Sequence, residues 1–278
     1  MVMDTMKIQT TDLIRLLDKV QRKHSVAGST QPQVSACMLR GDGTDEVSVT
    51  SLVKDGVTSV FRFSASTRPQ TEMEEIPIPD IDRIKGVLKY HGGILDIKYV
   101  EGKLRLKSGK KSTTILASGN ARAFPHSPHT IAEWEQRSLE RARAIDSERH
   151  IYTTRDGSQI TPVLTVSLDS VELFEALRCA SMNSQKDGIF TFILDENVLS
   201  VRVGEDLKGS TTTVLWDDVP LNRNKWEAKF KGGLDHLMKH INGQIFVSFF
   251  DFRNFNQGIA MLITHGKQDF NYQAGALE

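Results

Sequence analysis

The sequence predicts an α+β protein made of two duplicated domains, each with antiparallel strands and two helices. Three observations support this fold class: the length of 278 residues, short runs that alternate apolar and polar residues, and two amphipathic stretches in each half. A chain of this length suffices for two domains of ordinary size, each with its own core. The apolar fraction of 39% and the charged fraction of 25% are typical of a folded soluble protein.

The two halves match element by element when residues 6–118 are set against residues 164–275. Each half opens with a short strand and an amphipathic helix, MKIQTTDLIRLLDKVQRKH in the first and LTVSLDSVELFEALRCASMN in the second. Three β-rich runs, a further strand, a second helix and three closing strands follow in both halves. The shared order of about nine elements indicates duplication rather than chance.

The second helix of each half has recognisable ends. These helices are IDRIKGVLKYHGG and LDHLMKHING, and Asp80 is placed to cap the first of them. Gly93 and Gly243 follow the two helices, where a left-handed backbone conformation is expected. We therefore expect both helices to be followed by a glycine turn.

We predict an N-terminal domain at 1–118, a connector at 119–162 and a C-terminal domain at 163–278. The connector begins with the proline-interrupted loop FPHSPH and continues as IAEWEQRSLERARAIDSER, a charged stretch with few large apolar residues. This pattern predicts an exposed helix on the surface. The helix either has a role of its own or is simply solvated.

Composition excludes several classes of protein. No run approaches the roughly 20 apolar residues that a membrane span needs, so no membrane partner is expected. The first residues include Asp4 and Asp12 and lack the pattern of a signal peptide, which predicts an intracellular protein. Cys37 and Cys179 are far apart in apolar stretches and are expected to be buried free thiols. With 35 basic and 35 acidic residues, a nucleic-acid partner requires segregated charge.

Catalytic and cofactor motifs fail on spacing. SGKKST around Lys110 lacks the glycine spacing of a phosphate-binding loop and predicts a polar hairpin turn instead. His236 and His240 stand four residues apart, but Leu237 occupies the position where a zinc protease needs glutamate. No GxSxG or GxGxxG motif is present. We therefore expect no enzyme, no metal and no cofactor.

A duplicated β-domain that carries helices, with one connector between the copies, resembles the DNA sliding clamps, the family of proliferating cell nuclear antigen and related archaeal and phage clamps. The resemblance is carried by the order of elements, above all by IDRIKGVLKYHGGILDIKYVEGKLRLKSGKKSTTILAS, KGGLDHLMKHINGQIFVSFFDF and the C-terminal NYQAGALE. Two departures from the family pattern are a longer connector and a tail after Tyr272 without the usual proline.

The resemblance implies a non-catalytic homotrimer, a closed ring of six similar domains with sheets outside and helices lining the hole. Such a ring encircles double-stranded DNA without sequence preference and tethers a DNA polymerase and other proteins that carry clamp-binding peptides. An ATP-dependent clamp loader would place it on DNA, in the cytoplasm or nucleoid of an archaeal or phage-infected cell. The alternative is a monomeric or open clamp-like accessory factor for replication or transcription.

Basic side chains recur on the polar faces of the predicted helices. Because lysine and arginine contacts to phosphate carry no sequence information, such a lining holds DNA without fixing its register. A single basic helix face is usually only solvated, and recurrence around the hole that the family implies favours DNA contact. The expected DNA contacts are Arg15, Lys19, Arg22, Lys23, Arg83, Lys85, Lys89, Arg178, Lys186, His236 and Lys239.

The resemblance also implies two protein contacts. It places residues 112–118 and 211–216 at sheet edges that join neighbouring subunits, with contacts from Thr113, Thr114, Ile115, Leu116, Thr212, Thr213, Val214 and Leu215. It places a partner groove beside the C-terminal strand and the connector, lined by Phe255, Gly258, Ile259, Tyr272, Ala274, Gly275 and Trp134. For Ile259, a place in the core is an equally good interpretation.

Overall fold

The computed structural model divides into two compact units, Met1–Leu52 with Val60–Gln136 and Val53–Ser59 with Arg137–Glu278. The structure describes residues 5–26, 29–34, 36–42, 46–55, 57–66, 73–116, 152–153, 157, 159–181, 189–205, 209–219, 225–231, 234, 238–251, 259–265 and 269–274. The helix expected in the connector and the boundary at residue 118 lie outside these residues. The connector's described part contains the strand pair β11 (Tyr152–Thr153) and β12 (Gln159–Ile160).

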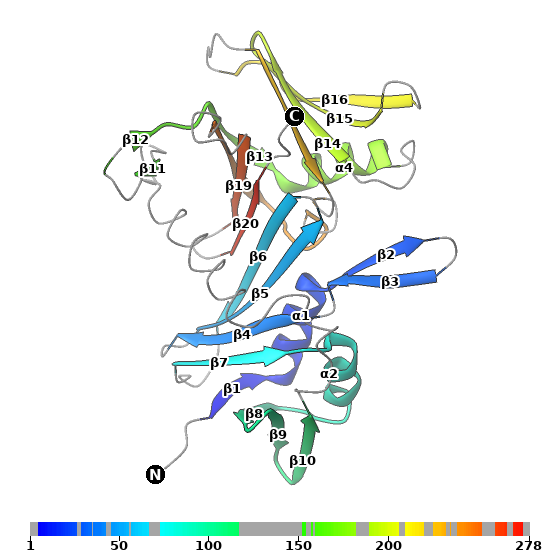
Figure 1. Ribbon diagram of the computed structural model, residues 1–278, viewed down its shortest axis with the longest axis vertical. Helices are drawn as coiled ribbons and strands as arrows, with labels where there is room; N and C mark the ends of the chain where they lie inside the picture. The colour runs from blue at the N-terminus through cyan, green and yellow to red at the C-terminus, as the bar shows by residue number, and fades with distance from the viewer. Residues whose placement is uncertain are drawn as a thin grey trace. The chain divides into compact units, whose positions relative to one another are not determined.

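The first repeat begins with a strand and a helix and closes with a three-stranded meander (Figure 1). Its elements are β1 (Met6–Gln9), α1 (Thr10–Val20), β2 (Arg22–Val26), β3 (Ser29–Val34), β4 (Cys37–Asp42), β5 (Glu46–Asp55), β6 (Val57–Ser66), β7 (Met73–Ile78), α2 (Ile81–Leu88), β8 (Ile94–Val100), β9 (Lys103–Ser108) and β10 (Lys111–Leu116). The strand orders are β1-β8-β9-β10 and β6-β5-β4-β7, and β2 pairs with β3.

The second repeat has the same plan. Its elements are β13 (Leu164–Asp169), α4 (Ser170–Ser181), β14 (Ile189–Asp195), β15 (Val198–Glu205), β16 (Gly209–Trp216), β17 (Trp226–Lys231), β18 (Gln244–Asp251), β19 (Ile259–His265) and β20 (Asp269–Ala274). The strand orders β13-β18-β19-β20 and β16-β15-β14-β17 repeat those of the first half. The expected fourth helix is described only at Leu234 and Met238, both helical and buried. The predicted duplication is confirmed as an α+β fold with antiparallel sheets.

The β2–β3 hairpin was not predicted, and the first helix is shorter than expected. α1 ends at Val20, and Gln21 has the extended angles φ −72° and ψ 126°. The apolar face of α1 would continue at Lys23 and His24, which have nothing to bury, so the helix has no reason to extend. Figure 1 shows the hairpin leaving the end of α1 as a separate ribbon.

The two repeats fill their cores differently. In the first, α1 buries Leu13, Leu16, Leu17 and Val20, and α2 buries Ile81, Ile84 and Leu88. In the second, Phe192 lies 5.9 Å from Phe230 and 5.2 Å from Phe249, with ring centroids as the reference points. The Trp226 ring lies 4.9 Å from Phe249. Among the described side chains, one topology is therefore filled mainly by aliphatic residues in the first copy and by an aromatic cluster in the second.

Each repeat fastens the start of its first helix to the glycine turn that follows its second helix. The Thr10 N–H donates to the Gly93 carbonyl at 3.0 Å, and the Thr10 hydroxyl donates to the same oxygen at 2.9 Å. In the second repeat, the Ser170 N–H donates to the Gly243 carbonyl, also at 3.0 Å. The predicted glycine turns are present, with φ of +69° at Gly93 and +99° at Gly243. Gly93 lies five residues beyond the end of α2, in the turn into β8 rather than at the helix terminus.

We predict that Gly93→Ala and Gly243→Ala each lower the free energy of unfolding, by about 1–2 kcal/mol, because a side chain is strained at positive φ. Gly243→Ala should cost more, since its φ lies further from the left-handed helical range. No atom lies within 4 Å of an added Cβ at either glycine, so crowding does not contribute. Urea unfolding measures the change.

Gly86 provides the matched control. It lies inside α2 and an added Cβ there also meets nothing within 4 Å. Gly86→Ala should therefore raise stability by roughly 0.5–1 kcal/mol through helix propensity. Equal effects of all three substitutions would show that the positive φ of the two turns has no role in stability.

Candidate nucleic-acid interface and subunit edges

The polar side chains of α1 and α2 are a mixture of cations and acids. The exposed Arg15 donates to Asp12 at 3.2 Å, and Lys85 of α2 forms an ion pair with Asp18 of α1. Lys85 also donates to the Gln21 side chain at 3.0 Å. Lys85, one of the expected DNA contacts on the polar face of α2, is half-buried: its ammonium group links the two helices, which pack against each other.

Further cations stand at both ends of α2. The Asp80 side chain accepts a hydrogen bond from the Arg83 N–H at 2.9 Å, which confirms the predicted N-cap. Arg83 and Lys89 are exposed, and so is Asp82 beside them. On α1, Lys19 is half-buried. The exposed cations available on these two helices are thus Arg15, Arg83 and Lys89.

The described face of α4 is not basic. Its exposed charged residues are Glu172, Glu175 and Arg178, so acids outnumber the cation. The expectation that a basic stripe recurs on every helix is therefore wrong for this part of α4. The physical reason is that α4 buries Leu173, Ala176 and Leu177, which leaves the two glutamates facing water.

The remaining expected DNA contacts are distributed unevenly. Arg22 and Lys23 lie on β2 rather than on the first helix, and only the backbone of that strand is described. Lys239 is exposed in the turn before β18, and the neighbouring His240 is half-buried. Lys186 and His236 lie outside the described residues.

The two strands predicted to join subunits are both outer strands of their sheets. Within the described residues, β10 is the last strand of β1-β8-β9-β10 and β16 is the last strand of β16-β15-β14-β17. Leu116 on β10 is 59% exposed and Val214 on β16 is 57% exposed, unusual values for large apolar side chains. Ile115 is buried within its own domain, so Leu116 is the apolar side chain that β10 presents outward.

The other predicted contact residues of β10 and β16 are mostly polar. Ser112 and Thr114 are exposed on β10, and Thr212 is exposed on β16, while Thr113 and Thr213 are half-buried. Leu215 is half-buried at an irregularity in the pairing of β15 with β16.

A buried histidine fixes the outer strand β10 to its own domain. His91 Nδ1 lies 2.8 Å from the Ser108 hydroxyl on β9, and Nε2 lies 3.0 Å from the Thr113 hydroxyl on β10. Lys111 Nζ donates to the Tyr90 carbonyl at 2.7 Å, which adds a second link between this strand and the turn after α2. His91 was not predicted as a functional or structural site, because the sequence gives no signal for it beyond its position in the turn after the helix.

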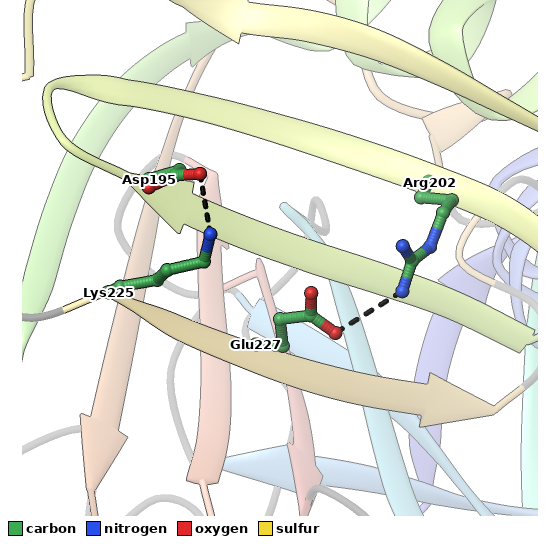
Figure 2. A network of polar contacts seen from close by, with 4 residues as sticks. All are labelled: Asp195, Arg202, Lys225 and Glu227. Carbon is green, nitrogen blue, oxygen red and sulfur yellow. Dashed lines mark hydrogen bonds and ion pairs between the residues drawn. The ribbon is translucent and has the colours of Figure 1, made fainter.

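The exposed face of the second repeat's sheet β16-β15-β14-β17 carries paired charges of both signs. Figure 2 shows Arg202 of β15 donating to Glu227 of β17 at 3.2 Å, and Lys225 donating to Asp195 at 2.7 Å. The hydrogen bond to Asp195, with the negative charge of that group, raises the pKa of Lys225. The charges of these four residues cancel in two ion pairs.

Other chemistry is sparse in the part of the chain that the structure describes. No group of three or more His, Cys, Asp or Glu side chains is arranged there to hold a metal ion. Burial raises the pKa of the Cys37 thiol, as predicted for a buried free cysteine. Gly109 and Lys110 form the turn between β9 and β10, which confirms that SGKKST is a hairpin turn. No helix among the described segments is long and apolar enough to cross a bilayer.

Solved structures show what this arrangement resembles. The match to the DNA polymerase sliding clamp of Pseudomonas aeruginosa covers 99% of this chain and 64% of that clamp, with a TM-score of 0.63 and 16% sequence identity. The match to the sliding clamp of Caulobacter crescentus covers 99% of this chain and 65% of that clamp, with a TM-score of 0.60 and 15% sequence identity. The match to the DNA polymerase III beta subunit of Thermotoga maritima covers 99% of this chain and 65% of that subunit, with a TM-score of 0.58 and 12% sequence identity. The chain has the fold of a DNA sliding clamp.

The sliding-clamp fold is thus recognised at very low sequence identity, and the resemblance inferred from the order of elements is confirmed at the level of structure. The chain spans 64% to 65% of the length of these three relatives. No model of a protein family matches the sequence. No curated protein is similar to it in sequence.

Among the residues expected at the partner groove, only some belong to the described part of the fold. Ile259 is 7% exposed on β19, which favours its place in the core. Tyr272 and Ala274 lie on β20, where their backbones pair with Leu262 and Ala260. Phe255, Gly258, Gly275 and Trp134 lie outside the described residues.

We predict that His91→Ala lowers the free energy of unfolding by about 2–3 kcal/mol, because it opens a cavity and leaves the hydroxyls of Ser108 and Thr113 without their partner. Urea unfolding measures the loss, and hydrogen exchange should show faster exchange in β10. Tyr90→Ala is the control, since the Tyr90 side chain is 73% exposed. If both variants unfold at the same urea concentration, the histidine bridge does not stabilise the hairpin.

Proposed function

We propose that this chain is a sliding clamp, a non-catalytic ring subunit that surrounds duplex DNA and tethers a DNA polymerase and other replication proteins. The observation that supports this most directly is the match of 99% of the chain to the sliding clamps of Pseudomonas aeruginosa and Caulobacter crescentus. The duplicated topology adds support, because equivalent repeats suit a ring with pseudo-rotational symmetry.

Ring closure is proposed to join β10 of one copy to β16 of the next. Both are outer strands of their sheets among the described residues, and each presents an exposed aliphatic side chain, Leu116 or Val214. Because the two edges differ, each copy would use one edge toward each neighbour, a head-to-tail contact that closes into a ring.

Charge favours an antiparallel arrangement at this contact. The exposed Lys110 precedes β10, and the exposed Asp217 and Asp218 follow β16. Antiparallel pairing brings the start of β10 next to the end of β16, so the lysine and the aspartates meet. Parallel pairing would separate them by the length of the strands.

We predict that Lys110→Glu or Asp217→Lys alone weakens assembly about tenfold or more, because like charges then oppose each other at the junction. The two substitutions in one chain should restore assembly. Light scattering over a concentration series measures the mass, and a trimer has three times the 31.1 kDa of one chain. Lys225→Glu is the control and should not change the mass. It lies on the sheet face where Arg202 pairs with Glu227 and Lys225 with Asp195, which we call the charge-paired face.

Two outcomes would count against this interface. Assembly that survives both single substitutions places the contact elsewhere, and a single-chain mass for the unmodified protein favours the open, monomeric accessory factor.

The DNA contacts are proposed to come from the cations of the helices, which the clamp arrangement directs toward the hole. Arg15, Arg83, Lys89 and Lys239 are exposed and suited to phosphate. Lys85 would act through its link to α1 rather than by direct contact. Such a lining is modestly charged, so retention on DNA would rest on enclosure more than on affinity.

The partner site is proposed to lie beside β20, where clamp-binding peptides of a polymerase or a loader would dock. A peptide with apolar anchors needs apolar or amphipathic side chains to receive them, and Tyr272 on β20 is a residue of that kind. The proposed partner site is supported by the resemblance of the C-terminal sequence NYQAGALE to the terminal strand of the sliding clamps.

Topological retention is the direct test of the function. Subunits dissociated in mild urea and reassembled in the presence of nicked circular plasmid should co-elute with the plasmid in gel filtration. Cutting the plasmid once should release them, because a ring slides off a free end. A linear plasmid of the same sequence in the reassembly step is the control. Protein that stays bound after the cut binds DNA by ordinary contact, which contradicts the clamp.

A further inference from the structure

The outward face of the sheet β1-β8-β9-β10 carries an excess of positive charge. One face of this sheet is buried by residues such as Ile8, Leu95 and Leu104, and α1 packs against β1. On the opposite face the acid is Asp96 and the cations are Lys7, Lys98, Lys103, Arg105 and Lys107, which we call the basic sheet face.

Strand register places these cations side by side. Lys98 is directly opposite Arg105, and Asp96 is opposite both Lys7 and Lys107. Directly opposite residues of an antiparallel pair lie on one face, and like charges there are destabilising. Along β9, Lys103, Arg105 and Lys107 alternate with buried residues, so consecutive cations stand about 6.7 Å apart. The result is a row of cations on β9 with a further one on each of β8 and β1.

The fold itself does not require these cations. With Gly93 and Gly243 as equivalent turns, Lys98 corresponds to Ser248, Arg105 to Leu262 and Lys107 to Thr264. None of the second repeat's residues at these positions is charged, and Ser248 and Leu262 are buried. The same sheet position therefore carries uncharged residues, two of them buried, in the second repeat and a basic face in the first.

Solvation alone does not explain the excess of one sign. The open face in Figure 2 meets water with Arg202 paired to Glu227 and Lys225 paired to Asp195. The helices α1 and α2 also pair cations with their own acids. The basic sheet face is the strongly one-signed surface among the described residues, and it lies opposite the helices that the clamp arrangement directs toward the hole.

We propose that the basic sheet face binds the phosphate backbone of DNA that runs outside the ring. Cations spaced along one strand suit a regular row of phosphates, and no aromatic side chain lies on this face to stack on bases. Binding would therefore be independent of sequence. The choice of DNA over another polyanion rests on the proposed clamp function, while the site itself follows from register and charge.

The test compares two variants that lose the same charge. One removes the row with Lys103→Gln, Arg105→Gln and Lys107→Gln, and the control removes three cations of the charge-paired face with Lys225→Gln, Arg202→Gln and Lys229→Gln. Fluorescence anisotropy measures binding of labelled short linear duplex and single-stranded DNA over a salt series. Short linear DNA cannot retain a ring by topology, so this assay isolates direct contact.

The first variant should bind both DNAs roughly tenfold more weakly at low salt, and its slope of log affinity against log salt should fall by about 3 on duplex DNA. The control should match the unmodified protein. Retention on circular plasmid should persist in both variants, which separates failure of this site from failure of the clamp function.

Three results would overturn the proposal. Unchanged affinity and slope in the first variant would show that the face does not contact DNA. Equal loss in both variants would show that only net charge matters. If the first variant keeps its affinity for DNA but loses the affinity of the unmodified protein for a labelled polyglutamate peptide, the face binds an acidic protein partner instead.

Discussion

Both repeats depend on one hydrogen bond, from the first N–H of the leading helix to the carbonyl of a glycine with positive φ. In the first repeat it joins Thr10 to Gly93, and in the second it joins Ser170 to Gly243. Each bond closes a loop of more than 70 residues and satisfies a helix-start donor that would otherwise be buried alone. Because the glycine directly precedes β8 or β18, the bond also sets where the central strand begins, and hence the register of the whole sheet.

The sequence predicted the order of elements well because apolar periodicity and turn residues are local signals. Asp80 as a cap and the glycine turns are local in this sense. The β2–β3 hairpin was missed because its residues offer neither a long alternating run nor a helical face. The site was predicted less well, since charge pairing is set in space: nothing local shows that Lys85 meets Asp18, or that α4 leaves Glu172 and Glu175 outward.

The two copies have diverged in complementary ways. Among the described side chains, the first has a mainly aliphatic core and a basic sheet face, whereas the second has an aromatic cluster around Phe249 and uncharged residues at the compared sheet positions. Core volume and pattern can change together while the topology persists, which explains how clamp folds are shared at 12% to 16% identity. The surface chemistry of each copy is then free to follow its own role.

The unlike edges β10 and β16 have a consequence for mixtures of chains. In the head-to-tail ring proposed above, a chain damaged at one edge would still offer the other to an intact neighbour. Such a chain is a terminator: it joins an open arc and stops the arc from closing. A single defective allele would therefore poison rings built largely from normal subunits, whereas a chain damaged at both edges would be inert.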